Sequence, residues 1–166
     1  MPSMRWIVGV DPGTVSPGVA VLEENVESRT GLRLVEHELI KVEGQRSFRL
    51  YWIHDRLTKL FQRLEAQQPG RRMDVAVEYM FVGSNAKTSM IMGEARGVIL
   101  AAAGAVPKAR IYDYPPSSMK LEIAGHGHAE KPQVAAAVSL LLGLDELLPF
   151  DVADAAGLAI LHSRKV

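Results

Sequence analysis

The sequence predicts an α/β domain in which a mixed central sheet is flanked by helices. Short apolar runs, each too short for a helix and bounded by glycine or proline, are gathered in the early part of the chain. From Ser47 onward, segments with apolar residues at helical spacing alternate with further short strands. A length of 166 residues suits one domain with a complete core, so we expect residues 1–166 to form a single domain.

The first expected strand is the run from Trp6 to Val10, which Pro12 and Gly13 close. It is apolar on both faces, as is typical of a strand buried within a sheet. Asp11 stands at its end, where an ionised carboxylate is costly unless it is paired or binds a cation. Asp11 is therefore a candidate functional residue. On this stretch alone, an equally good interpretation is that Asp11 caps the Pro-Gly turn.

Later strands and helices follow from changes in periodicity and from residues that break regular structure. A second apolar run begins at Gly18, and residues 32–42 alternate loosely, as in a strand with one exposed face. A short apolar run over residues 73–77 ends in Glu78 and is the second buried strand to deliver a carboxylate. The other expected elements are helices over residues 47–64, 89–104, 117–123, 130–142 and 151–163, and a strand over residues 109–114.

The helix expected over residues 89–104 is rich in glycine, alanine and methionine. Small side chains allow a neighbouring helix to approach closely. We therefore expect this segment to be the central helix of the fold and a contact between subunits. An ordinary buried helix is an equally good interpretation.

Composition excludes several classes of site. The chain has no cysteine, which excludes disulfides, zinc sites on thiolates and thiol nucleophiles, and suits a reducing cytoplasm. The first residues lack a signal-peptide pattern, and no apolar run approaches the roughly 20 residues that span a bilayer, so we expect no membrane association. Nineteen basic residues balance nineteen acidic ones, which argues against a nonspecific polyanion binder but leaves room for a local basic surface.

Four carboxylates form the most informative pattern in the chain. Asp11 and Glu78 each end an apolar strand, and Asp151 and Asp154, three residues apart, share one face at the start of the last helix. If the strands are neighbours and the helix start points at them, the four acids converge. Like charges share a site only when cations offset them, and Mg²⁺ or Mn²⁺ prefers such oxygen ligands. Such a site supports two-metal hydrolysis of a phosphodiester.

Each of these acids also has an ordinary interpretation. Aspartates in a first helical turn satisfy free N–H groups and the helix dipole, so capping is the simpler hypothesis for Asp151 and Asp154 taken alone. Glu78 could form a salt bridge at a strand edge. His126 and His128 flank one glycine in a loop without cysteine, which is too weak a pattern for a metal assignment. Pattern alone thus indicates a metal site and no particular substrate.

Five ordered blocks of the sequence resemble the bacterial RuvC family of Holliday junction resolvases. They are GVDPGT at 9–14, Val77-Glu78 with Phe81 and Asn85, GEARG at 93–97, AGHGHAEK at 124–131, and DVADA at 151–155. Together they cover nearly the whole chain with compatible spacing. The resemblance implies a ribonuclease H-like fold, a homodimer, and divalent-metal-dependent cleavage of four-way DNA junctions by paired symmetric nicks in recombination and repair.

The resemblance also implies roles for individual residues. Asp11, Glu78, Asp151 and Asp154 fall on the family's catalytic, metal-binding acids, which implies Mg²⁺ or Mn²⁺, two per active site. Phe81 falls on the aromatic residue near the junction centre, and Lys120 and Lys131 fall on DNA-contacting basic residues. The RuvA and RuvB branch-migration proteins are candidate partners, although the residues themselves do not decide this.

Each of the DNA-contacting assignments also has an ordinary structural interpretation. Phe81 could belong to the core, but it follows a strand end and precedes Gly83, a loop setting in which an exposed aromatic suits stacking on a base. Lys120 and Lys131 could be solvated surface charges, as most lysines are; beside an acidic cluster they would contact phosphates.

Two departures from the family pattern concern the loop after Glu78. Family members often carry a basic residue just before Asn85, whereas residues 82–84 are neutral here, which bears on junction opening. Tyr79 takes a position that is usually polar and amide-like, which bears on local sequence readout.

Three rival functions stay open at this stage. The same four acids would serve another ribonuclease H-like nuclease, for example one that cuts RNA–DNA hybrids. Residues 11–14 also resemble the phosphate loop of actin- and sugar-kinase-like phosphotransferases, but those proteins need two such lobes. A noncatalytic junction-binding module is disfavoured because all four acids are present.

Overall fold

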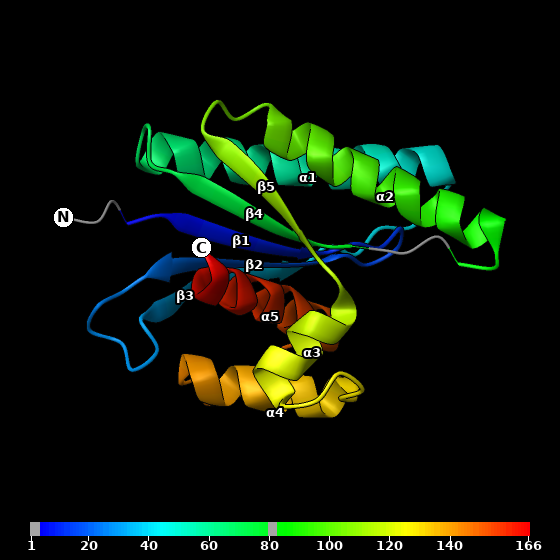
Figure 1. Cartoon of the computed structure of the whole chain (residues 1–166). Coiled ribbons are helices and arrows are strands. Elements are labelled where there is room, and N and C mark those ends of the chain that lie inside the picture. Colours follow the sequence, from blue (N-terminus) through cyan, green and yellow to red (C-terminus); the bar gives the residue numbers. More distant parts are fainter. Residues whose placement is uncertain (1–3, 80–82) are drawn as a thin grey trace.

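The computed structural model describes residues 4–79 and 83–166, and its elements form a sheet with helices on both faces (Figure 1). The elements, in chain order, are β1 (Trp6–Asp11), β2 (Gly18–Glu24), β3 (Leu32–Leu39), α1 (Arg46–Gln67), β4 (Met73–Glu78), α2 (Ala86–Gly104), β5 (Ala109–Tyr114), α3 (Pro116–Ala124), α4 (Lys131–Leu142) and α5 (Phe150–Lys165). The predicted α/β class with a mixed central sheet is confirmed.

The order of the five strands is β3-β2-β1-β4-β5. β1 pairs antiparallel with β2, and β2 pairs antiparallel with β3, whereas β1–β4 and β4–β5 are parallel pairs. Because β1 and β4 are parallel neighbours, their carboxyl ends lie at the same edge of the sheet. That edge therefore receives both Asp11 and Glu78.

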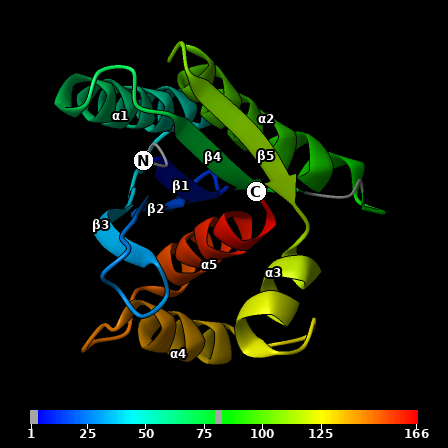
Figure 2. The same ribbon diagram turned by 60° about the vertical axis from the view of Figure 1, so that its left-hand side comes forward.

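Two hydrophobic clusters form the core, one on each face of the sheet. Residues of β1 point alternately to both sides: Val8 and Val10 pack with the buried stripe of α1 and with α2, whereas Ile7 packs with α5. Helix α5 lies between the sheet and the outer helices α3 and α4 (Figure 2). The result is a layer of α1 and α2, then the sheet, then α5, then α3 and α4.

The expectation that the small-residue helix is central was wrong in one respect. That segment is α2, which packs on α1 and β5, while the helix at the centre of the fold is α5, in which every residue from Val152 to His162 except Asp154 is buried. Alanine and glycine make α5 slim enough to be covered on both sides, whereas Gly93 and Gly97 of α2 face open space. The role of α2 as a subunit contact stays a prediction. Within the two described ranges, no helix is long and apolar enough to cross a membrane.

Candidate metal centre

The candidate site begins with two strand ends. Asp11 is the last residue of β1 and is 9% exposed, and Glu78 is the last residue of the neighbouring β4. Both strands are short runs of buried apolar residues whose backbones are fixed by pairing on both sides. The carboxylates are therefore held by the most rigid part of the fold.

Helix α5 brings the other two acids because its backbone lies directly on two glycines of the sheet. A Cβ added at Gly18 would lie only 2.1 Å from the backbone oxygen of Asp151, and one added at Gly9 would lie 1.7 Å from the backbone oxygen of Ala155. Gly18 is the register partner of Asp11. The first turn of α5 is thus placed directly over the strand end that carries Asp11.

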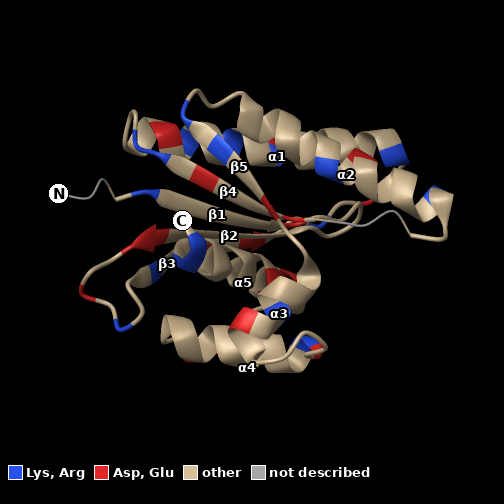
Figure 3. Ribbon diagram, viewed as in Figure 1, with Lys and Arg blue, Asp and Glu red and all other residues tan. Residues whose placement is uncertain are grey.

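The four acids meet at one cavity, as the sequence predicted. Asp11, Asp151 and Asp154 each offer a carboxylate oxygen, and the three oxygens lie within 4.8 Å of one another. Glu78 lies beside Asp11 on the same wall. A hollow of about 310 Å³ is lined by these four acids together with Pro12, Met92, Pro116, Met119, Lys120 and Lys131. Acidic segments of the ribbon gather at this edge of the sheet (Figure 3).

Crowding of the carboxylates shifts their protonation. The pKa of Asp11 rises to about 9, first because the group is buried, then because it shares a hydrogen bond with Glu78, and then by repulsion from Glu78, Asp154 and Asp151. Burial also raises the pKa of Asp154, with repulsion from Glu78 and Asp151 adding to the effect and Lys131 opposing it. Without a cation, the cavity holds a proton that a divalent ion would displace.

Lys131 is the lysine of the cavity that contacts the acids directly. Its Nζ donates to Asp151 Oδ1 at 2.9 Å and lies 3.6 Å from Asp154 Oδ2. The hydrogen bond with Asp151 raises the pKa of Lys131, so the ammonium group stays charged at neutral pH. One lysine leaves the four acids incompletely neutralised. The donor set, made of hard carboxylate oxygens, fits divalent cations such as Mg²⁺ or Mn²⁺.

The ordinary interpretations of the acids fare poorly in the structure. The N-cap of α5 is Pro149, without a side-chain cap hydrogen bond, and Asp151 bonds to Lys131 instead. Within the described part of the chain, Glu78 has no ion pair, and β4 is an interior strand. Of the predicted DNA-contacting residues, Lys120 and Lys131 line the cavity, whereas Phe81 lies outside the described residues.

Sequence reasoning missed the residues that shape the site without carrying charge. Gly18 was interpreted only as the start of a strand, although its lack of a Cβ lets α5 approach. Met119 lines the cavity and lies against Gly157 of α5, where an added Cβ would be 2.8 Å from the methionine sulfur. The sequence did contain a signal for the close approach of α5 to the sheet, namely a glycine, Gly18, opposite the strand-end aspartate Asp11.

Comparison with known proteins was made for the whole chain. A family model described as crossover junction endodeoxyribonuclease RuvC matches residues 7–162. The chain belongs to the RuvC family. Curated RuvC relatives include the protein of Halothermothrix orenii, 36% identical over 161 residues, which are 95% of this chain and 92% of the relative. The RuvC protein of Moorella thermoacetica is 37% identical over 161 residues, or 95% of this chain and 90% of the relative.

Solved structures of RuvC match the fold closely. The structure of Thermus thermophilus RuvC is 31% identical with a TM-score of 0.79, and covers 96% of this chain and 93% of that one. T. thermophilus RuvC in complex with a Holliday junction substrate gives a TM-score of 0.80 at the same identity and coverage. The yeast mitochondrial Holliday junction resolvase, 14% identical with a TM-score of 0.61, covers 98% of this chain and 79% of its own, and shows the shared fold alone. The ribonuclease H-like fold expected from the family resemblance is confirmed.

Proposed function

We propose that this RuvC-family chain resolves four-way DNA junctions by paired symmetric nicks, with Asp11, Glu78, Asp151 and Asp154 as its catalytic acids. The observation that carries the proposal is the convergence of these acids with Lys120 and Lys131 on one cavity. A neighbour that shares 31% of the sequence and nearly the whole fold has been solved on a Holliday junction substrate. Junction DNA is therefore the proposed substrate.

Two divalent cations, Mg²⁺ or Mn²⁺, would make water a better nucleophile and stabilise the leaving oxygen of the phosphodiester. The acids of the chain would hold these ions, with Asp11 giving up its proton as they bind. Lys131, anchored on Asp151, and Lys120, which also lines the cavity, would contact the phosphate and offset its developing charge. Phe81 would stack on a base near the junction centre.

The proposed active unit is a homodimer, since a two-fold enzyme matches the two-fold symmetry of a junction with paired cuts. Helix α2 supports this proposal. At Gly93, Gly97 and Gly104 an added Cβ would meet nothing within 4 Å, so packing within the described chain does not require these glycines. They leave a flat strip that a second α2 would fit. RuvA and RuvB are proposed as the partners that deliver the junction.

The proposal is tested with a labelled synthetic junction, Mg²⁺ or Mn²⁺, and linear duplex and RNA–DNA hybrid as competing substrates. We expect paired nicks confined to the junction. Asp11→Asn should still bind the junction and fail to cut it. Asp145→Asn, which alters an exposed loop aspartate outside the cavity, is the matched control and should cut normally.

Other outcomes would redirect or reject the proposal. Cleavage retained in Asp11→Asn would contradict the assignment of the site. Cutting of the hybrid in preference to the junction would leave the metal site intact but assign it to a different nuclease activity. Junction binding without cutting by the unaltered chain would indicate a noncatalytic module.

A further inference from the structure

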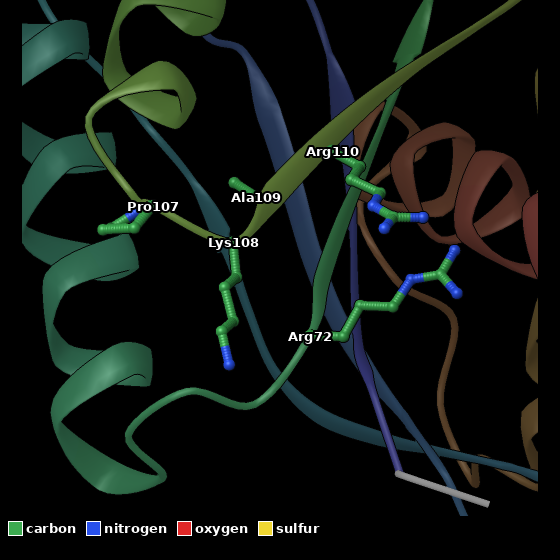
Figure 4. Close-up of a pocket in the computed structure, with 5 residues that line it drawn as sticks. All are labelled: Arg72, Pro107, Lys108, Ala109 and Arg110. Atoms are coloured by element: carbon green, nitrogen blue, oxygen red, sulfur yellow. The ribbon is translucent and has the colours of Figure 1, made fainter.

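A second charged hollow lies at the other edge of the sheet. It measures about 360 Å³ and is lined by Arg72, Pro107, Lys108, Ala109 and Arg110, where β4 and β5 begin (Figure 4). At about 3.3 Å per residue, the six residues from Arg72 to Glu78 place it roughly 20 Å from the acidic cavity. The acidic cavity therefore does not explain why positively charged residues gather at this hollow.

Arg72 is held in place by its neighbours. Its Nε donates to Asp74 Oδ1 at 2.8 Å, and its Nη2 donates to the hydroxyl of Tyr112 at 3.2 Å. Within residues 4–79 and 83–166, its Nη1 has no hydrogen-bond partner. The guanidinium group is thus oriented in advance, with one nitrogen left to bind something else.

Arg110 lies beside Arg72 without a counter-charge. Arg110 is the register partner of Asp74, so it shares a face of the sheet with Asp74 and with Arg72 two residues earlier. Figure 4 shows the guanidinium groups of Arg72 and Arg110 extending in the same direction. The side chain of Arg110 is exposed and makes no hydrogen bond or ion pair with any part of the chain that the structure describes.

Asp74 accepts three hydrogen bonds from the described chain, and none of them comes from Arg110. Its Oδ2 accepts from Arg5 Nη1 at 2.8 Å and from His162 Nε2 at 2.9 Å, and its Oδ1 accepts from Arg72. Like charges on neighbouring strands of one face repel unless an anion lies between them. Arg110 and the Nη1 group of Arg72 are therefore donors without a partner in the described chain, and both lie beside an open hollow.

We propose that Arg72 and Arg110 form a binding site for a phosphate group, separate from the catalytic cavity. Arginine is suited to phosphate recognition, and a phosphate group has enough acceptor oxygens to take hydrogen bonds from the guanidinium of Arg110 and from Arg72 Nη1 at the same time. The phosphate comes either from a free phosphate or pyrophosphate or from the backbone of a junction arm that reaches past the catalytic edge.

Arg110→Gln is the primary test, because the exposed side chain has no partner whose loss would unfold the chain. Arg29→Gln is the matched control: it removes the same guanidinium group from an exposed residue between β2 and β3 that does not line the hollow. Calorimetric titration of the full-length, metal-free protein with inorganic phosphate and pyrophosphate is compared with chloride at equal ionic strength.

We expect millimolar or tighter binding by the unaltered protein, at least tenfold weaker binding by Arg110→Gln, and less than a twofold change in Arg29→Gln. Equal binding by Arg110→Gln and the unaltered protein, or no binding by the unaltered protein, would overturn the proposal. The source of the phosphate is decided with junctions of short and long arms. If Arg110→Gln weakens binding of the long-arm junction only, and if the salt dependence of that binding falls by about one phosphate contact, the DNA backbone is the ligand. If the variant binds both junctions as the unaltered protein does, the ligand is the free anion.

Discussion

At the scale of single residues, Asp11 has the least favourable electrostatic setting among the four acids of the cavity. Its backbone is fixed in the interior of the sheet, its side chain is nearly buried, and three other carboxylates surround it. A group of this kind keeps its proton at neutral pH unless a cation replaces it. The structure thus makes cation binding and proton release at Asp11 a single event.

Asp11→Asn is predicted to stabilise the metal-free protein at alkaline pH. The pKa of Asp11 is about 9 in the folded chain and near 3.8 when unfolded, so between these values the folded state binds the additional proton. The free energy of unfolding therefore falls as pH rises from about 4 to about 9. Asparagine is neutral throughout, so the melting temperature in a chelator should decline less with pH, with a residual slope from Asp154. An unchanged slope in Asp11→Asn would show that Asp11 does not carry this shift.

Lys131→Gln is predicted to separate metal binding from catalysis. Lys131 partly neutralises Asp151 and Asp154, so its loss makes the cavity more negative and should tighten Mg²⁺ or Mn²⁺ binding. The same change removes a cation from the phosphate, which should slow single-turnover cleavage roughly 10–100-fold. Calorimetry and junction cleavage measure the two effects. Lys87→Gln, on exposed α2, is the control; weaker metal binding by Lys131→Gln would contradict this account.

At the scale of elements, the geometry of the site depends on contacts at both ends of α5. Its first turn lies on Gly18, and its last turns are anchored by His162, which is fully buried. His162 contacts Asp74 of β4 through Nε2 at 2.9 Å and the Tyr114 hydroxyl of β5 through Nδ1 at 2.7 Å. The helix is thereby held along the two parallel strands, and Asp151 and Asp154 reach the edge where β1 and β4 end.

Gly18→Ala is predicted to impair the site by lifting the start of α5 from the sheet. The added methyl group would lie 2.1 Å from a backbone oxygen that has no freedom to rotate away, so the helix must move. We expect a loss of about 1–3 kcal/mol in the free energy of unfolding and weaker metal binding. Gly127→Ala is the control, because its methyl group meets no atom closer than 3.6 Å, an ordinary van der Waals contact. Normal metal affinity in Gly18→Ala would show that α5 does not depend on this contact.

Periodicity was enough to predict the order of these elements, because β1, β2 and β4 are short buried runs, β3 and β5 are short runs bounded by glycine or proline, and the helices carry apolar residues at helical spacing. The position of the acids at strand ends and at the start of α5 was equally visible. The central place of α5 was not, since an alanine-rich segment covered on both sides looks like α2 in sequence. The anchor of Asp74 and His162 was also missed, because its partners are 88 residues apart and only the folded sheet joins them.

At the scale of the whole molecule, zero net charge conceals an uneven distribution. Acids gather at the edge where β1 and β4 end, while lysine and arginine mark the starts of β4 and β5 (Figure 3). Because the chain has no net charge, its overall electrostatic field does not attract a polyanion. Affinity for a polyanion therefore comes from local groups, namely bound cations and the lysines at the cavity. We accordingly expect junction binding to depend on divalent ions as well as on salt.

The proposed dimer leads to a prediction about the pairing of cuts. A mixed dimer of one unaltered and one Asp11→Asn subunit, isolated through two different affinity tags, has one functional cavity. Because one chain supplies all four acids of a cavity, the unaltered subunit should still nick its strand, and nicked but unresolved junctions should accumulate. A mixed dimer with Asp145→Asn is the control and should resolve junctions fully. Full resolution by the Asp11→Asn mixed dimer would show that one cavity can serve both strands, and the two-fold argument for pairing would fail.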